Sequence, residues 1–298
     1  MRKFSMLLIC LLQGLFLLLY PTVSNAQNKG LLWQISGKNI KQPTYLFGTI
    51  HIYDTSLYKL PAPVMAKLAQ VKKVYFELDF GHLNPAEIVK YAMVTDSAQQ
   101  LNKLLDTVML AKLKRAAKDQ PTLSLLAMNG ALYRFKPMFI MPMFLNNGKT
   151  VTIDMEMYKQ AAAQKIAIEG LETVAEQMNA INTVTITKQA QMLTDFLKTY
   201  TGADPLIKKM TATYVKQDTD HLLEEMNEGA PLDADFNKAL LIDRNKVMAD
   251  RMSKAMGSQS TMFAVGAGHL GGKDGLITLL RKKGFVVKPV PFAFLKAH

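Results

Sequence analysis

The chain reads TMFAVGAGHLGG from Thr261 to Gly272, and the fold class is best predicted from this stretch. Its first five residues are apolar or β-branched, which predicts a buried strand. The glycines that follow predict a turn, residues 274–283 carry a helical pattern, and residues 285–290 predict another strand. A strand, a helix and a strand in this order form a βαβ unit, so at least part of the sheet is expected to be parallel.

Further strands are expected upstream of this unit. Residues 31–35 (LLWQI) and 44–47 (TYLF) are separated by a Gly-Lys-Asn turn and predict a β-hairpin. Residues 73–79 (KVYFELD) predict a strand whose apolar core ends in acids, and residues 165–169 (KIAIE) predict a short strand that also ends in an acid.

Most of the remaining chain is predicted to be helical. The Met- and Phe-rich stretch 125–145 is broken by Arg134, Pro137 and Pro142, so we expect a buried helix pair or a lid over a cleft and not a membrane segment. The predicted class is therefore mixed α/β (α+β), with a central, partly parallel sheet, an N-terminal hairpin and a large helical insertion around residues 85–150 and 172–256. The other helical stretches are 63–70 and 153–164.

Residues 1–26 have the pattern of a secretory signal. Arg2 and Lys3 precede an apolar run that ends near Leu19, and Ser-Asn-Ala stands before Gln27. The run is shorter than the roughly 20 residues that span a bilayer. We therefore expect cleavage before Gln27, export of a 27–298 domain to the periplasm or the medium, and no stable membrane span afterwards.

Composition excludes several classes of function. The single cysteine, Cys10, lies in the predicted signal, so the processed chain has neither disulfides nor thiolate chemistry, and metal ligands are limited to histidine and carboxylate. The 36 basic and 24 acidic residues give a net charge of +12, which is spread along the chain. Without a basic, aromatic-rich motif this charge predicts a surface that faces an anionic envelope, and no nucleic-acid partner.

The residues with catalytic chemistry follow the predicted strands. In open α/β sheets ligands bind at the carboxyl ends of the strands. A set of imidazole nitrogens and carboxylate oxygens suits Mn²⁺, Co²⁺ or Zn²⁺. His269 is expected to lie in a strand-end loop outside the core. The strand-end residues are His51 in Gly48-x-x-His51, Glu77, Glu169 with Glu172, and His269 in Gly266-x-x-His269.

Other polar residues have weaker patterns. His82, His221 and His298 are expected on the surface. Arg244 and Arg251 share one face of a predicted helix, and only one of them is expected to point at the cleft.

Taken together, these segments resemble the TraB/GumN family, which includes the Tiki metalloproteases, and more remotely the erythromycin esterases and ChaN-like haem-binding proteins. The resemblance covers nearly all of the chain after the signal. It is carried by YLFGTIH (45–51), VYFE (74–77), IEGLE (168–172) with Gln177, Arg244-Asn245, VGAGHLGG (265–272), GLITLL (275–280) and Gly284-Phe285.

The resemblance implies a metal-dependent hydrolase, with peptide-bond cleavage supported by Mn²⁺ or Co²⁺ in the Tiki branch. His51, Glu77 and His269 would then hold the metal. Glu169 or Glu172 would accept a proton from water, and Arg244 would stabilise the oxyanion of an amide or small ester substrate. Two alternatives stay open: a metal-free, esterase-like hydrolase in which a His-Glu pair activates water, and a binding protein that holds haem or a metal without turnover.

Overall fold

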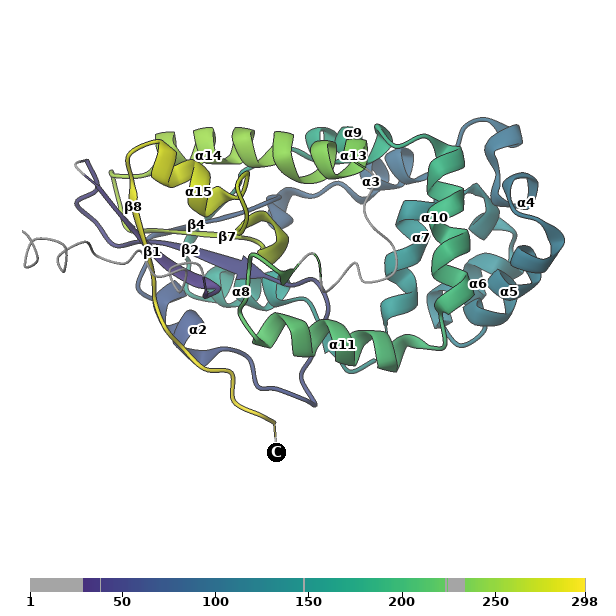
Figure 1. The fold of residues 1–298 in the computed structure, drawn as a ribbon, viewed down its shortest axis with the longest axis horizontal. Coiled ribbons are helices and arrows are strands. Elements are labelled where there is room, and N and C mark those ends of the chain that lie inside the picture. The colour runs from purple at the N-terminus through teal and green to yellow at the C-terminus, as the bar shows by residue number, and fades with distance from the viewer. Residues whose placement is uncertain (1–28, 38, 147, 223, 225–233, 298) are drawn as a thin grey trace, which may run out of the picture.

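The structure, a computed structural model, describes residues 29–37, 39–146, 148–222, 224 and 234–297. Its centre is a six-stranded mixed sheet in the order β6-β4-β7-β2-β1-β8 (Figure 1). The predicted signal at 1–26 lies outside the described residues. The strands of this sheet are β1 (Leu32–Ser36), β2 (Thr44–Thr49), β4 (Lys73–Phe76), β6 (Ala167–Gly170), β7 (Thr261–Gly266) and β8 (Val286–Pro289).

The predicted hairpin and the predicted parallel pairing are both confirmed. Strands β1 and β2 pair antiparallel, whereas β2, β7, β4 and β6 are parallel neighbours. Strands β2 and β7 are buried on both faces, except that Gly266 at the end of β7 is only partly covered. Apolar side chains in near-continuous runs, rather than in alternation, are what a strand covered on both faces requires.

The two strands of the C-terminal βαβ unit, β7 and β8, are not adjacent in the sheet. Strand β8 runs in the same direction as β7, but β2 and β1 lie between the two. The crossover through α15 (Leu276–Lys282) therefore passes over the hairpin and reaches the sheet edge. The buried strand β2 occupies the position beside β7 that β8 takes in a simple βαβ unit. The parallel neighbours of β7 are therefore β2 and β4.

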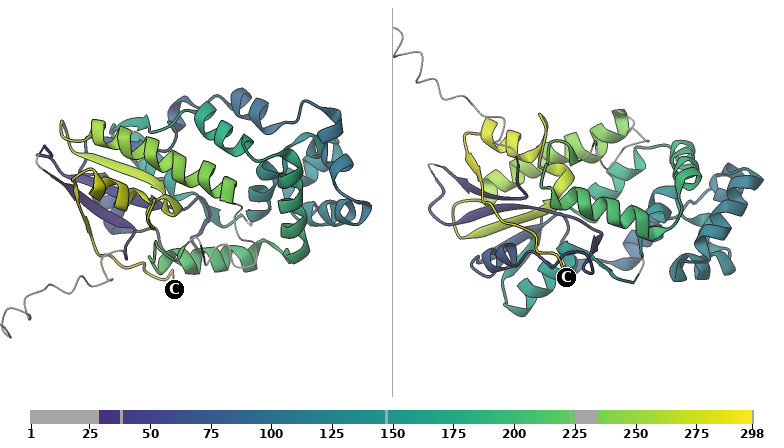
Figure 2. Two further views of the ribbon diagram at one scale, coloured as in Figure 1. Left: turned by 45° about the horizontal axis from the view of Figure 1, so that its top comes forward. Right: turned by 60° about the horizontal axis from the view of Figure 1, so that its bottom comes forward.

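Helices cover both faces of the sheet, as the two turned views show (Figure 2). Helices α14 (Asp243–Ala255) and α15 pack together on one face, and α2 (Ala62–Leu68) and α8 (Ile153–Ala163) pack together on the other. The core between these layers includes the fully buried side chains of Trp33, Phe47, Phe76 and Phe263. This rigid centre positions the loops that follow the strands.

A second hydrophobic core lies in a cluster of helices at the far end of the molecule (Figure 1). Leu113, Leu132, Phe144 and Leu193 are buried within it. Stretch 125–145 forms short helical turns that are mostly half-buried, with Leu125 and Met128 exposed, so the expected buried helix pair is not formed. The helices of this cluster are α4 (Leu101–Leu104), α5 (Thr107–Ala117), α6 (Pro121–Met128), α7 (Pro137–Ile140) and α10 (Ile186–Thr199).

Three helices connect this cluster with the sheet: α3 (Pro85–Ala92), α9 (Val174–Asn182) and α11 (Ala203–Val215). A two-stranded ribbon of β3 (Tyr53–Asp54) and β5 (Thr150–Val151) lies beside the sheet. Within the described part of the chain, no helix combines the length and the apolar character needed to cross a bilayer.

Candidate active site

The carboxyl ends of three adjacent parallel strands bring the predicted residues together. His51 follows β2, Glu77 follows β4, and His269 lies in the short 3₁₀ turn η8 (Ala267–His269) that follows β7. In register, Thr49 lies opposite Gly266 and Phe76 lies opposite Ala264, so the three loops leave the sheet at the same edge. Parallel pairing is the physical reason why residues so distant in sequence meet here.

Glu77 is the buried carboxylate at the centre of the group. Its Oε1 accepts the backbone N–H of Gly266 at 2.7 Å, and its Oε2 accepts from Arg244 Nη2 at 2.7 Å and from Gln177 Nε2 at 3.0 Å. Burial alone would raise the pKa of Glu77, but the charges of His269, Arg244 and His51 and the Gly266 N–H outweigh it and lower the pKa to about 2. Glu77 is therefore an anion at every physiological pH.

His269 is 5% exposed, so the expectation that it lies outside the core is wrong. The turn folds back under α14, where His269 Nδ1 lies 2.7 Å from Asn245 Oδ1. Asn245 Nδ2 donates to the carbonyl of Asp274, so its Oδ1 must accept from His269. The free electron pair of His269 is consequently on Nε2. Burial lowers the pKa of His269 to about 4 against the raising effect of Glu77, and the imidazole is neutral at pH 7.

His51 has the opposite environment, with a side chain that is 64% exposed. Its Nδ1 lies 3.1 Å from Oδ2 of the buried Asp154, and a carboxylate can only accept, so Nδ1 carries the proton. Partial desolvation works against a charged ring, but the hydrogen bond and charge of Asp154, together with Glu77, raise the pKa of His51 to about 9. A metal ion that binds Nε2 must therefore displace a proton.

The two glycines of the Gly-x-x-His segments are required for different reasons. A Cβ at Gly48 would lie 2.6 Å from Leu270 Cδ1, so this glycine allows the loop after β7 to pack against β2. A Cβ at Gly266 would lie 3.1 Å from Glu77 Oε1, 3.7 Å from His269 Cδ2 and 4.0 Å from His51 Nε2. All three candidate ligands thus border one point that a side chain at position 266 would fill; we call it the Gly266 space.

The donor set around the Gly266 space fits a divalent cation. No group of three or more His, Cys, Asp or Glu side chains in the described residues already has metal-binding geometry. The electron pair of His269 Nε2 nevertheless faces the anionic Glu77 Oε1 at 3.6 Å, and two acceptor atoms placed opposite each other favour a cation between them. Two bonds of about 2.0–2.2 Å to one ion can span that separation. The oxygen acceptors on both Nδ1 atoms are the usual partners of metal-binding histidines.

Arg244 lies beside this group but is already fully engaged. Its Nε and Nη2 bind both oxygens of Glu172 at 2.6–3.1 Å, its Nη2 also binds Glu77, and its Nη1 donates to the carbonyl of Leu240. The arginine side chain is 11% exposed. The structure thus places Arg244 and Glu172 in one buried ion pair behind Glu77, where burial raises the pKa of Glu172 against the lowering effect of Arg244.

Glu169 is the predicted residue that the structure does not bring to the histidines. It lies on the edge strand β6 opposite Tyr75, and its carboxylate pairs with Lys73 at 2.5 Å, half exposed. Arg251, about two helical turns beyond Arg244, pairs with Glu176 on the surface. Of the two arginines, Arg244 alone contacts Glu77, as expected for one of the pair.

Asp154 and Asn245 are site residues that sequence reasoning missed in these roles. Asp154 stands in the first turn of α8, where an acid is common for helix-dipole reasons alone. Its contact with His51 joins residues 103 positions apart. Gln177 and Asn245 belong to the family-like segments, but only the fold shows that each binds a candidate ligand.

The expectation that His82 and His221 lie on the surface is confirmed. Both are exposed, and each pairs with an aspartate three residues earlier, Asp79 and Asp218 respectively. His298 lies outside the described residues.

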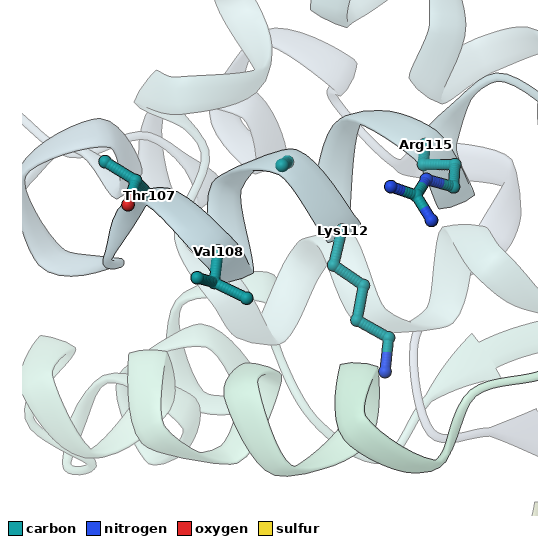
Figure 3. Close-up of a pocket in the computed structure, with 5 residues that line it drawn as sticks. Thr107, Val108, Lys112 and Arg115 are labelled. Atoms are coloured by element: carbon teal, nitrogen blue, oxygen red, sulfur yellow. The ribbon is translucent and has the colours of Figure 1, made fainter.

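A surface hollow on α5 has none of this chemistry (Figure 3). It measures about 420 Å³ and is lined by Thr107, Val108, Ala111, Lys112 and Arg115, without a carboxylate or an imidazole. The candidate site is therefore the group at the strand ends and not this hollow.

The two histidines of the metal-free protein are expected to titrate about five pH units apart, His269 near pH 4 and His51 near pH 9. Long-range ¹H–¹⁵N spectra recorded across this range measure both. Because the pKa of His269 is lower in the folded state than in the unfolded state, the free energy of unfolding decreases as pH falls from about 6.5 to 4. The raised pKa of His51 adds stability below about pH 6.5 that is lost as pH rises through 9. Two ordinary titrations near pH 6.5 would contradict the arrangement.

The fold and these strand-end residues define an α/β protein whose candidate centre is a histidine and carboxylate cluster. The profile of the TraB/PrgY/gumN family matches residues 31–289, and the chain belongs to this family. The resemblance expected from the sequence is thereby confirmed.

Among similar curated proteins, metalloprotease TIKI2 of Danio rerio is 24% identical over 325 residues, covering 90% of this chain and 62% of the relative. Metalloprotease TIKI1 of Danio rerio is 22% identical over 307 residues, covering 84% and 61%. The human TIKI1 is 21% identical over 303 residues, covering 84% and 60%. The chain thus spans about three fifths of the length of these relatives. No solved structure matches significantly.

Proposed function

We propose that the protein is an exported, metal-dependent hydrolase that cleaves an amide or small ester bond, with a peptide as the favoured substrate. The observation that carries this proposal is the Gly266 space, bordered by His51, His269 and Glu77 with two acceptor atoms facing each other. Distant similarity to TIKI metalloproteases supports the same class of reaction.

Three side chains would hold the ion: His51 and His269 through Nε2, and Glu77 through its carboxylate. A divalent ion such as Mn²⁺, Co²⁺ or Zn²⁺ would supply a Lewis acid and a water of lowered pKa. Asn245 holds His269 in the tautomer with a free Nε2. Gln177 and Arg244 hold the Glu77 carboxylate, and Arg244 offsets part of its charge.

The electrostatics favour this mechanism over a metal-free His-Glu pair. A carboxylate with a pKa of about 2 is a weak base, and a histidine with a pKa of about 9 is already protonated at neutral pH. His269, with a pKa of about 4, is also a weak base. None of the three is poised near pH 7 to activate water alone, whereas all three are suitable ligands once His51 loses its proton.

The roles first considered for the outer residues change in this proposal. The proton acceptor is proposed to be neither Glu169, which pairs with Lys73 on the sheet edge, nor Glu172, whose two oxygens are bound by Arg244. Arg244 is assigned to holding Glu77 instead of to an oxyanion, because its donors are directed at Glu77, Glu172 and Leu240.

Gly266→Ala is expected to abolish metal retention and hydrolysis while leaving the protein folded. The backbone at Gly266 (φ −52°, ψ 135°) is allowed for alanine, so the added methyl acts by filling the space 3.1 Å from Glu77 Oε1. Retained Mn²⁺ and peptidase activity are measured. The matched control is Gly37→Ala, whose Cβ meets Phe285 at 3.3 Å far from the site and should change neither. Normal activity of Gly266→Ala would contradict the proposed centre.

Metal analysis of untagged protein separates the three candidate functions. The proposed hydrolase retains a divalent ion and loses activity in chelator, with recovery on adding Mn²⁺. Activity that is indifferent to chelator would identify the metal-free hydrolase. Stoichiometric metal or haem without hydrolysis of peptide or ester substrates would identify the binding protein.

Export is proposed on the sequence pattern of residues 1–26 alone. Mass spectrometry of the protein recovered from cells is expected to show an N-terminus at Gln27, in the periplasmic or secreted fraction. An intact Met1 on membrane-bound protein would instead identify the segment as an anchor.

A further inference from the structure

We propose that Asp154 is a positioning residue of this site, which holds the His51 ring in one orientation and one tautomer so that Nε2 faces the Gly266 space. The metal part of this inference rests on the proposed function, whereas the orientation of the ring does not.

The contacts of Asp154 divide its two oxygens between two partners. Oδ1 accepts the hydroxyl of Thr49 at 2.6 Å, and Oδ2 lies 3.1 Å from His51 Nδ1. The aspartate side chain is 2% exposed. A carboxylate clamped on one oxygen by Thr49 has a fixed second oxygen, so the ring that binds it is fixed as well.

The backbone around Asp154 is fastened to the same loop as His51. Thr152 Oγ1 donates to the carbonyl of His51 at 3.0 Å, and the N–H of Ile153 donates to the carbonyl of Ile50 at 3.1 Å. Strand β5, directly before α8, pairs with β3, directly after His51. The start of α8 therefore moves with the His51 loop, and the Asp154 to His51 distance does not depend on a flexible segment.

His51 needs this support more than His269 does. The His269 ring is enclosed by the core, whereas the His51 ring is 64% exposed and little packing restrains its rotation. Within the described residues, the His51 ring forms its side-chain hydrogen bond with Asp154. One hydrogen bond, donated by His51 Nδ1 to a buried carboxylate, thus holds the His51 ring as burial and Asn245 hold the His269 ring.

Asp154 also determines which nitrogen of neutral His51 carries the proton. It lies in the first turn of α8, an 11-residue helix, with Oδ2 directed at the His51 ring. A carboxylate oxygen can only accept, so neutral His51 must carry its proton on Nδ1 and present the free electron pair on Nε2. A fixed tautomer and a more basic ring are what carboxylate partners of metal-binding histidines contribute.

The test replaces Asp154 by asparagine, which keeps the shape but has one acceptor oxygen for two donors. The probe is Mn²⁺ alone, titrated into the metal-free full chain by calorimetry. We expect Asp154→Asn to weaken Mn²⁺ binding by roughly 10–100-fold, the range for such supporting carboxylates. Long-range ¹H–¹⁵N spectra above the pKa of His51 should show one Nδ1-protonated ring in the wild type and mixed tautomers in the variant.

The chain contains a matched control. Asp79 holds the Nδ1 of His82 at 2.8 Å in another aspartate and histidine pair, three residues apart on the surface. Asp79→Asn removes the same kind of bond and should leave Mn²⁺ affinity and the His51 spectrum unchanged. Thr49→Val removes the hydrogen bond to Oδ1 but keeps the carboxylate. It should lower the melting temperature and leave neutral His51 protonated on Nδ1.

Wild-type Mn²⁺ affinity together with a single Nδ1-protonated His51 in Asp154→Asn would overturn the proposal. If Asp154→Asn does not fold, Asp154→Ser is used, because serine suits the first turn of a helix and does not reach His51. If the wild type binds no Mn²⁺, the proposed function fails, and the tautomer measurement still decides the positioning role.

Discussion

His269→Ala is expected to abolish hydrolysis and metal retention. The residue supplies one of the two imidazole nitrogens at the Gly266 space, and its loss would leave the ion short of one of its three ligands and its water without a fixed position. The loss of several kcal/mol of transition-state stabilisation corresponds to a fall in kcat/KM on the order of 10³-fold or more. Peptidase assays with added Mn²⁺ measure it.

Folding has to be controlled in this experiment because His269 is buried. Alanine leaves Asn245 Oδ1 without its donor, at a cost of about 1–3 kcal/mol. His269→Asn is the better variant, since its amide can donate near the position of Nδ1 while Nε2 is lost. His82→Asn, on the surface, serves as the matched control and should be fully active. Loss of activity only in proportion to unfolded protein would refute the metal-ligand role.

Arg244→Met is expected to destabilise the fold by about 3–5 kcal/mol at pH 7, because it leaves the buried carboxylates of Glu77 and Glu172 without their common cation. Urea unfolding measures the loss. The pKa of Glu77, now about 2, should rise in the variant. In the wild type, Glu77 contributes stability above about pH 4.5 that is lost as pH falls towards 2. The variant does not have this contribution to lose, so the difference in stability should shrink as pH falls.

Arg251→Met is the control on the same helix. Arg251 pairs with Glu176 at the surface, where both side chains are about two-fifths exposed, and such pairs contribute about 1 kcal/mol or less. Equal destabilisation by the two substitutions would show that the Arg244 ion pair has no special role.

Local patterns were sufficient for most of the fold. Apolar runs identified the hairpin, the strand before Glu77 and the strand before His269, because side-chain periodicity and turn residues are properties of short segments. The place of β8 was not visible in the same way. It reaches the sheet edge beyond β1, and a choice between sheet positions depends on contacts that no single segment contains.

The site shows the same division more sharply. The Gly-x-x-His segments and Glu77 could be selected because parallel strands place their carboxyl ends together. Glu169 looked equivalent to them, yet it lies on an edge strand with its side chain bound to Lys73. One residue of register decides which face of the sheet a side chain takes, and a strand-end acid does not reveal its register.

The segments of the sheet, the family motifs and the residue types available for a metal can all be identified from the sequence: histidine and carboxylate, without cysteine in the predicted processed chain. How these groups are charged and held depends on the tertiary structure. In the fold, His269 is buried and bonded to Asn245, and the exposed His51 is bonded to Asp154. Arg244 pairs with two glutamates. The physical reason is that hydrogen bonding, burial and charge depend on distances of a few ångströms between residues far apart in the chain.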